Sequence, residues 1–397
     1  MITAAAASVM LLAALGQAPA SSLAPALSPL EASTLAKVRA ALPQRTVPAL
    51  SEALVQAARA LARSAARGDP HPLSSPALRA ALGDAGVTDP SPAAVVLSAG
   101  VGSLPEAVAA AAHFRGATHL GIGVVVHEQL AWAVLLASER RAELDPFPRR
   151  VAPGSRAVLA GRLLLLDGPR AWVAAPSGAA FEIPVEAEGR RFRAPIHFDQ
   201  AGTWRIEVGG TGARGATVAA LLEVSCADGA TAAPPGGTPG PPGSEPPGSE
   251  PSGPSDEARI RAAVNGLRAR QGLAPIQGSA ALDEQASSQS QAMLAAGTVA
   301  HRLPGGDDLP ARVAASGVRF RSARENVARG DVALDAHRAT VESPAHLANL
   351  LAPRVELMGL GIARGALPGG QPVVYLTEIL VEPLDPVPVG ASPTGER

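Results

Sequence analysis

Residues 343–363 read SPAHLANLLAPRVELMGLGIA, and this stretch gives the clearest structural signal in the last third of the chain. Ser343 is a favourable N-cap, and Pro344 suits the first turn of a helix. The stretch therefore predicts a short helix that carries His346 and Asn349. Two apolar runs, VELMGLGIARG and VVYLTEILVE, follow this helix and indicate a pair of strands that closes the domain.

Two longer helices are expected ahead of this stretch. The segment DEARIRAAVNGLRARQG starts at Asp256, which we expect to be its N-cap, and stops at Gly272. The segment SAALDEQASSQSQAMLAAG is capped by Ser279 and stops at Gly297. Helices on both sides of a small sheet predict a layered α/β/α domain over residues 256–386.

The order of motifs in this domain resembles the CAP superfamily of cysteine-rich secretory and pathogenesis-related proteins, in its bacterial form. The run VNGLRARQGLAPI resembles the opening helix of that family, and His301 follows the second helix as the family's histidine does. The phrase RENV at 324–327 resembles the family's Gly-Glu-Asn phrase. The stretch at 343–363 resembles the family's Ser-Pro-Gly-His-Arg-x-Asn-Ile-Leu and its later Gly-x-Gly.

The resemblance implies a central cleft lined by two histidines and two acidic residues. Carried over position by position, His301, Glu325 and His346 match three of these four places, and Asn326 belongs to the same phrase as Glu325. The second acidic place has no unambiguous match, and Glu342 lies next to it. We therefore expect these five residues to form the candidate binding cleft.

The sequence also departs from the family pattern in two places. Arg324 replaces the glycine of the Glu-Asn phrase, and Thr340 stands where bacterial members usually carry tryptophan. Both changes indicate an altered cleft.

In some family members the cleft binds a divalent metal. Imidazole nitrogen and carboxylate oxygen suit a zinc-like cation, so His301, His346 and Glu325 are the candidate ligands, and zinc is the candidate cofactor. Without metal, we expect Glu325 to accept a hydrogen bond from one imidazole. The alternative for each residue is a local structural role in which neighbouring backbone groups satisfy the side chain.

Our leading functional hypothesis is binding of an extracellular or envelope partner without turnover. The alternative is a metal-assisted hydrolase in which Glu325 is the general base while His301 and His346 hold the ion. A third possibility, carriage of a small apolar ligand between helices, follows from the resemblance alone.

Residues 149–228 are typical of an all-β domain. Short apolar runs separated by Gly, Pro and Asp predict an immunoglobulin-like β-sandwich. The single cysteine, Cys226, ends the last run and is expected in the core, so an internal disulfide is excluded. Residues 229–255 contain a PPGSE repeat and predict an extended linker. Residues 387–397 are expected to be a disordered tail.

Residues 28–148 predict a helix at SEALVQAARALARSAA and two strands in ATHLGIGVVVHEQLAWAVLLASE. The run LRAALGDAGV echoes ARVAASGV of the C-terminal domain, in the same order. We interpret this region as an internal duplication, a degenerate CAP-like α/β domain, although chance similarity in an Ala-rich chain is the alternative. The counterpart of Glu325 falls near 93–94, and only His113 could take the place of His346.

Residues 1–20 are typical of a secretory signal peptide. An apolar run is followed by Ala18-Pro19-Ala20, which predicts cleavage after Ala20 and a secreted or periplasmic location. No basic residue precedes the run, so a buried or disordered Ala-rich start is the alternative. The run is shorter than the roughly 20 residues that a membrane helix needs, so no transmembrane segment is expected.

Composition limits the remaining possibilities. The 397 residues carry a formal net charge of -1 and are 47% hydrophobic, so the chain can build real cores and nothing indicates nucleic acid as a partner. Neither a Gly-Lys-Ser/Thr phosphate loop nor a Gly-x-Ser-x-Gly elbow is present. The sequence thus predicts an α+β multidomain protein.

Overall fold

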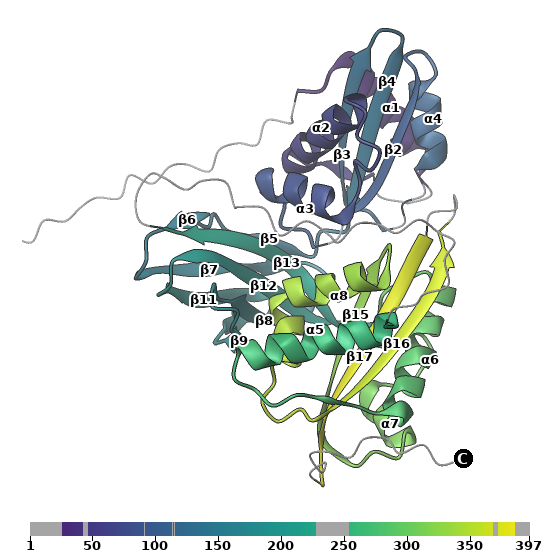
Figure 1. Ribbon diagram of the computed structural model, residues 1–397. Coiled ribbons are helices and arrows are strands. Elements are labelled where there is room, and N and C mark those ends of the chain that lie inside the picture. The colour runs from purple at the N-terminus through teal and green to yellow at the C-terminus, as the bar shows by residue number, and fades with distance from the viewer. Residues whose placement is uncertain are drawn as a thin grey trace, which may run out of the picture.

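The chain forms two α/β units with a β-sandwich between them in sequence (Figure 1). The computed structural model describes residues 26–42, 47–90, 92–112, 114, 116–227, 254–367 and 372–385. The predicted signal peptide, His113, residues 229–253 of the predicted linker and the predicted tail lie outside the described residues.

The first unit is a four-stranded sheet covered by helices on both faces. Its elements are α1 (Pro29–Ala41), β1 (Ala49–Leu50), α2 (Glu52–Ala66), α3 (Ser75–Asp84), β2 (Ala93–Gly100), α4 (Leu104–Ala111), β3 (His119–His127) and β4 (Leu130–Ser138). The strand order is β1-β3-β4-β2, with β1 parallel to β3 and the other pairs antiparallel. Helices α1 and α4 pack on one face, while α2 and α3 pack on the other.

Glycines allow α2 to lie directly on β3. Ser51 caps α2 by accepting a hydrogen bond from Leu54 N. A Cβ at Gly121 would lie 2.2 Å from the carbonyl carbon of Leu54, and one at Gly123 would lie 2.2 Å from the nitrogen of Arg59. Only glycine therefore fits at these two strand positions.

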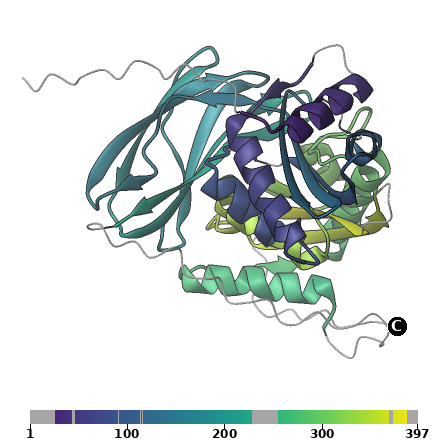
Figure 2. The ribbon, with the colours of Figure 1, turned by 90° about the horizontal axis from the view of Figure 1, so that it is seen from above.

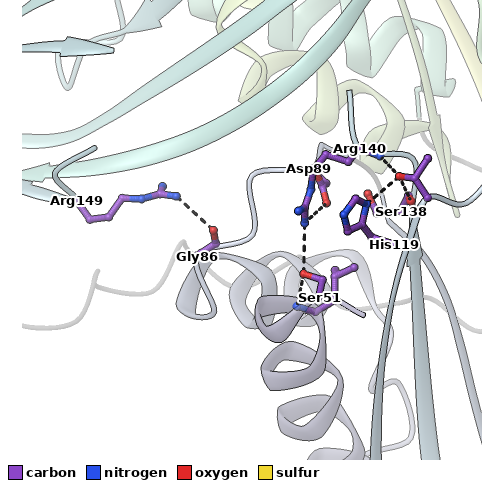
Figure 3. A network of polar contacts seen from close by, with 9 residues as sticks. Ser51, Gly86, Asp89, His119, Ser138, Arg140 and Arg149 are labelled. Carbon is purple, nitrogen blue, oxygen red and sulfur yellow. Dashed lines mark hydrogen bonds and ion pairs between the residues drawn. The ribbon is translucent and has the colours of Figure 1, made fainter. Parts of the chain in front are cut away.

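Polar contacts hold together the end of this unit that faces the sandwich (Figure 3). The Arg140 guanidinium lies 3.4 Å from the buried Asp89 carboxylate and donates to Ser51 Oγ at 3.3 Å. Arg149, at the start of the sandwich, donates to the carbonyl of Gly86 at 3.4 Å. These contacts join the loop ahead of β2 to both β4 and the next unit, which is a structural role.

The central unit is a sandwich of two sheets. Its strands are β5 (Ala142–Leu144), β6 (Arg150–Val151), β7 (Ser155–Leu163), β8 (Asp167–Ala174), β9 (Ala180–Ile183), β10 (Glu186–Glu188), β11 (Arg191–Phe198), β12 (Gly202–Gly212) and β13 (Gly215–Cys226). The sheet orders are β10-β11-β7-β5 and β6-β13-β12-β8-β9.

The sandwich core contains the edge-to-face pair Phe198 and Trp204, with ring centroids 5.4 Å apart. Cys226 is fully buried there, as its apolar run predicted. Strand β5 pairs with β7 although it precedes the predicted boundary at 148/149, so the sandwich takes a strand from the predicted first domain.

The C-terminal unit repeats the plan of the first. Its elements are α5 (Asp256–Arg270), β14 (Gln277–Gly278), α6 (Ala280–Ala296), α7 (Leu309–Ala315), β15 (Phe320–Gly330), α8 (Ala333–Glu342), α9 (Pro344–Leu350), β16 (Leu357–Ala366) and β17 (Pro372–Pro383). The sheet order is β14-β16-β17-β15, which places β15 at one edge. Helices α6 and α7 cover one face of the sheet, and α5 and α8 cover the other.

Two details of this unit differ from the sequence prediction. Ser255, and not Asp256, is the N-cap of α5, because its Oγ accepts a hydrogen bond from Ala258 N at 3.2 Å. Strand β15 was not predicted because its run FRSARENVARG lacks an apolar alternation. The prediction that Ser343 caps α9 is confirmed.

Arg268 of α5 is fully buried and connects the helix to distant backbone. Its guanidinium donates to the carbonyls of Ala274, Leu350, Ala352 and Val355 at 2.7–3.2 Å. Desolvation lowers its pKa. One side chain thus satisfies carbonyls after α5, at the end of α9 and in the loop after α9, all of which would otherwise need water.

The units also contact one another. The backbone N–H of Leu221 in the sandwich donates to the carbonyl of Thr88 at 2.8 Å, and Arg79 of α3 lies 3.0 Å from Glu342 of α8. Sandwich and C-terminal unit are joined by hydrogen bonds between Glu207 and Ser343, Ser177 and Gln271, and Arg214 and Arg302. No helix in the described ranges is long and apolar enough to cross a membrane.

Candidate functional site

A histidine, a carboxylate and an arginine meet at the edge strand β15. Helix α6 ends at Gly297 in the left-handed region, and the following loop brings His301 over Glu325. His301 Nδ1 and Glu325 Oε1 are 2.8 Å apart, and Arg312 Nη2 lies 2.6 Å from Glu325 Oε2. The side chains of Glu325 and Arg312 are 1% and 8% exposed, so water hardly reaches their ion pair. The predicted hydrogen bond between an imidazole and Glu325 is confirmed.

His346 reaches the same strand from α9. Its backbone N–H donates to Ser343 Oγ at 3.3 Å, which fixes the first turn of the helix. Burial lowers the pKa of His346 to about 4, and the charge of His301 lowers it too, while Glu378 raises it. His346 is therefore neutral at physiological pH and lies within electrostatic reach of His301.

Asn326 connects β15 to α9 and to the neighbouring strand. Its Nδ2 donates to the carbonyl of His346 at 3.2 Å and to Glu378 Oε2 at 2.9 Å. Its Oδ1 accepts from Asn349 Nδ2 at 3.0 Å. Because Asn326 is fully buried, it acts by positioning α9 and is not open to a ligand.

A second histidine–glutamate pair was missed by the sequence analysis. His337 Nδ1 lies 2.7 Å from Glu378 Oε1, and their side chains are 6% and 0% exposed. Two signals were available in the sequence. Glu378 is a charge within the apolar run VVYLTEILVE, and His337 shares the helical spacing of the buried Ala333, Ala336 and Thr340. Arg312, the partner of Glu325, gave no such signal.

Glu342 does not join the cleft. It lies 3.0 Å from Arg79 of the first unit, and burial raises its pKa against the effect of neighbouring arginines. The acidic residue that contacts the cleft residues is Glu378 instead. Thr340, at the place of the family's tryptophan, is buried and donates to the carbonyl of His337 at 2.8 Å. Arg324 is exposed and reaches Asn349 at 3.5 Å.

The model of the family CAP, described as the cysteine-rich secretory protein family, matches residues 261–377. The C-terminal unit is a CAP domain. No curated protein matches the chain in sequence.

Solved bacterial structures are similar to this chain. An outer surface protein from Borrelia burgdorferi is 18% identical with a TM-score of 0.29, over 32% of this chain and 92% of that one. An extracellular protein containing a SCP domain from Bacillus anthracis is 14% identical with a TM-score of 0.28, over 62% and 89%. A cysteine-rich secretory protein from Staphylococcus aureus is 12% identical with a TM-score of 0.26, over 57% and 75%.

The residues of this CAP domain do not fit a divalent cation. Glu325 presents one oxygen to His301 and the other to the Arg312 guanidinium, and that permanent positive charge occupies the place where a metal would need the carboxylate. Across the described residues, no group of three or more His, Cys, Asp or Glu side chains is arranged to hold a metal ion.

The sandwich touches both histidine-bearing segments of the CAP domain. The turn between β12 and β13 lies against His301, since a Cβ at Gly215 would be 3.1 Å from His301 Cβ. Ser343, which caps the helix of His346, donates to Glu207 Oε2 of β12. Burial raises the pKa of Glu207 to about 7, although its hydrogen bonds from Ser343 and Ala345 oppose that rise. The sandwich therefore fixes the geometry on both sides of the candidate cleft.

Proposed function

We propose that this protein is an exported, non-catalytic binding protein whose CAP domain recognises an extracellular or envelope partner at the cleft formed by His301, Glu325 and His346. The observation that carries the proposal is the engagement of Glu325 on both oxygens, by His301 and by Arg312. A carboxylate held in a buried ion pair is a poor general base, because removing it from the guanidinium is costly.

The same observation weighs against the metal-assisted hydrolase. A zinc ion would have to displace the Arg312 guanidinium from Glu325, with which it is paired at 2.6 Å. The cleft is better suited to hydrogen bonding with a partner. His346 is neutral at physiological pH and can donate or accept, and His301 is 22% exposed.

We further infer that the first unit is a degenerate CAP-like copy. Both units have the same strand order, and the same parallel and antiparallel pairings. In both, a Gly-x-Gly of the third strand lies on the second helix. Gly121 and Gly123 lie on α2, and Gly359 and Gly361 lie on α6. Shared topology together with a shared close approach supports duplication more strongly than the sequence echo did.

The remaining parts of the proposal concern the sandwich and export. Two sheets that share one core, antiparallel except for the short parallel pair of β6 and β13, support an immunoglobulin-like sandwich as a spacer or second binding module. The signal peptide over residues 1–20, the secreted or periplasmic location and the linker over residues 229–255 rest on the sequence pattern.

Calorimetry with zinc chloride tests the function on the full chain. We expect no saturable zinc uptake by the wild type in the micromolar range. Arg312→Gln removes the competing cation and should create a site at least about tenfold tighter than in the wild type. Arg302→Gln, at an exposed arginine of the segment between α6 and α7, is the matched control and should behave like the wild type.

Ester and peptide hydrolysis, assayed with and without zinc, completes the test. We expect the wild type and Glu325→Gln to be equally inactive. One-to-one zinc binding by the wild type that disappears in His301→Ala and His346→Ala, together with turnover that disappears in Glu325→Gln, would replace the binding proposal with the hydrolase.

A further inference from the structure

A cavity lies between the β-sandwich and the CAP domain, on the side of α9 away from Asn326. Its volume is about 500 Å³, which falls within the range of small-molecule sites. The β8–β9 end of the sandwich lies beside α5 and α8 in this region (Figure 1). In the view of Figure 2, α5 lies at the lower edge of the molecule, alongside the sandwich and the CAP sheet.

The CAP domain supplies most of the apolar wall. Leu267 of α5, Val341 of α8, and Leu347 and Leu351 of α9 line the cavity. These side chains belong to the apolar cluster that also holds Ala174 of β8, so the wall is part of the interface between the units. It is therefore rigid and largely preformed.

Two arginines supply the charge. Arg205 of β12 and Arg270, the last residue of α5, line the same cavity from opposite units. Within the described residues, neither guanidinium has a hydrogen bond or an ion pair at contact distance. Desolvation lowers the pKa of Arg205, and the nearest carboxylates that act on it are Glu342 and Glu223. Glu342 is already held by Arg79.

The rim joins the two units through neutral polar groups. Gln271 Nε2 donates to the carbonyl of Ser177 at 2.9 Å, so the turn between β8 and β9 closes one side. No acidic residue is among the described residues that line the cavity. A half-buried guanidinium without a partner, beside an apolar wall, is suited to an anion that carries an apolar group.

We propose that this interdomain cavity binds a small organic carboxylate with a compact apolar group. Arg205 and Arg270 bind the carboxylate, and the leucines contact the apolar group. The site is separate from the His301–Glu325 cleft and exists only where the sandwich and the CAP domain meet. Binding would therefore strengthen the contact between the two units.

Three probes with one carbon skeleton separate charge from apolar contact. We would titrate the full chain with 3-phenylpropanoate, 3-phenylpropanol and 3-phenylpropylamine by calorimetry. The carboxylate should bind at least about tenfold more tightly than the alcohol, and the amine should not bind, since a charged hydrogen bond is worth about 1.5–3 kcal/mol. The carboxylate alone should raise the midpoint of thermal unfolding.

Matched variants locate the site. Arg205→Gln and Arg270→Gln should each weaken carboxylate binding about tenfold while leaving the alcohol unchanged. Arg193→Gln, an exposed arginine of β11, should have no effect. Arg270 is exposed at a helix end, so Arg270→Gln tests the site even if Arg205→Gln loosens the interface. Equal affinity for all three probes, no binding at millimolar concentration, or an unchanged affinity in Arg270→Gln would overturn the proposal.

Discussion

The two α/β units have the same strand order, but only one of them carries a polar site on its sheet. In the CAP domain, β15 and β17 contribute Glu325, Asn326 and Glu378, all buried and all paired. In the first unit, the equivalent strands β2 and β4 carry only apolar side chains at the corresponding places. The sheet register makes this comparison possible residue by residue.

The glycines on the second helix provide the common reference. Gly359 pairs with Ile379, which pairs with Glu325, while Gly121 pairs with Leu136, which pairs with Ala94. One residue further along, the same register aligns Asn326 with Val95 and Glu378 with Leu135. The first unit therefore has alanine, valine and leucine where the CAP domain has its polar network.

This difference separates what the fold requires from what the site requires. The glycine contacts occur in both units, so they belong to the scaffold. The buried carboxylates and amide occur in one, so the scaffold is stable without them. A buried polar network that the fold does not need serves either the function of the domain or the positioning of the segments that it connects.

The largest expected effect comes from the shared contact. Gly361→Ala and Gly123→Ala each place a Cβ within 2.2 Å of helix backbone, so the helix must move away from the strand. We expect each variant to lose about 4 kcal/mol of unfolding free energy, or its unit to remain unfolded. Urea unfolding followed by circular dichroism measures this loss.

Gly266→Ala on α5 is the control for this pair. Its Cβ would meet only Arg270 Nη1 at 3.7 Å, and alanine favours helix, so stability should stay equal or rise by up to about 1 kcal/mol. The two glycine contacts would not be equivalent if the loss of unfolding free energy in Gly361→Ala or in Gly123→Ala were smaller than the gain in Gly266→Ala.

A smaller effect is expected from the polar network. Glu378→Leu copies the first unit but leaves His337 and Asn326 without their acceptor. We expect a loss of about 3 kcal/mol of unfolding free energy, because removing one partner of a buried pair leaves the other buried without a hydrogen-bond acceptor. Chemical denaturation of the full chain measures it.

Completing the replacement should restore stability. The triple variant Glu378→Leu, Asn326→Val and His337→Leu turns the network into an apolar layer like that of the first unit, and it should recover at least half of the loss. A triple variant less stable than Glu378→Leu would show that the network, and not only its pairing, holds the CAP domain together.

The smallest effect concerns how the sandwich contacts each unit. Its contacts with the first unit include the backbone bond from Leu221 to Thr88 and the bond from Arg149 to the Gly86 carbonyl, neither of which involves a carboxyl group, whereas its contacts with the CAP domain include the buried carboxyl of Glu207. The pKa of Glu207 is raised from 4.5 to about 7, so the Glu207 carboxyl stays protonated in the folded protein below about pH 7. Its stabilisation is fully present below pH 4.5 and is lost as the pH rises towards 7.

We expect the CAP transition to lose about 2 kcal/mol between pH 5 and pH 7 from this group. The difference in CAP unfolding free energy between the wild type and Glu207→Gln should change by about 2 kcal/mol over this range, because the opposite contribution of His346, whose pKa is lowered to about 4, is the same in both proteins. Thermal unfolding across this pH range provides the measurement. An unchanged slope in Glu207→Gln would assign the pH dependence to another group.

The CAP domain could be predicted from sequence because its signals are local. Ser343, Pro344 and His346 lie within one helical turn, and Gly359 and Gly361 are two residues apart. Cap, helix and glycine spacing all depend on neighbours in the chain. The contact between His301 and Glu325 could be predicted only through the family resemblance.

The rest depended on tertiary register. Arg312 reaches Glu325 from a separate helix, and His337 reaches Glu378 across 41 residues. No spacing rule connects such positions, since only the packing of α7 and α8 on the sheet brings them together. Strand β15 was not predicted for a related reason. It is an edge strand whose polar residues face helices, so its sequence does not show the alternation of apolar and polar residues that marks a strand.

Arg268 has a consequence for the order in which the CAP domain can form. The carbonyls that it holds at Leu350, Ala352 and Val355 lie 82, 84 and 87 residues further along the chain. In a chain made from its N-terminus, α5 is complete long before its acceptors exist. Contacts between such distant segments form slowly, because a long loop must close first. Burial of this guanidinium among its acceptors is therefore expected to be a late event in the formation of the domain.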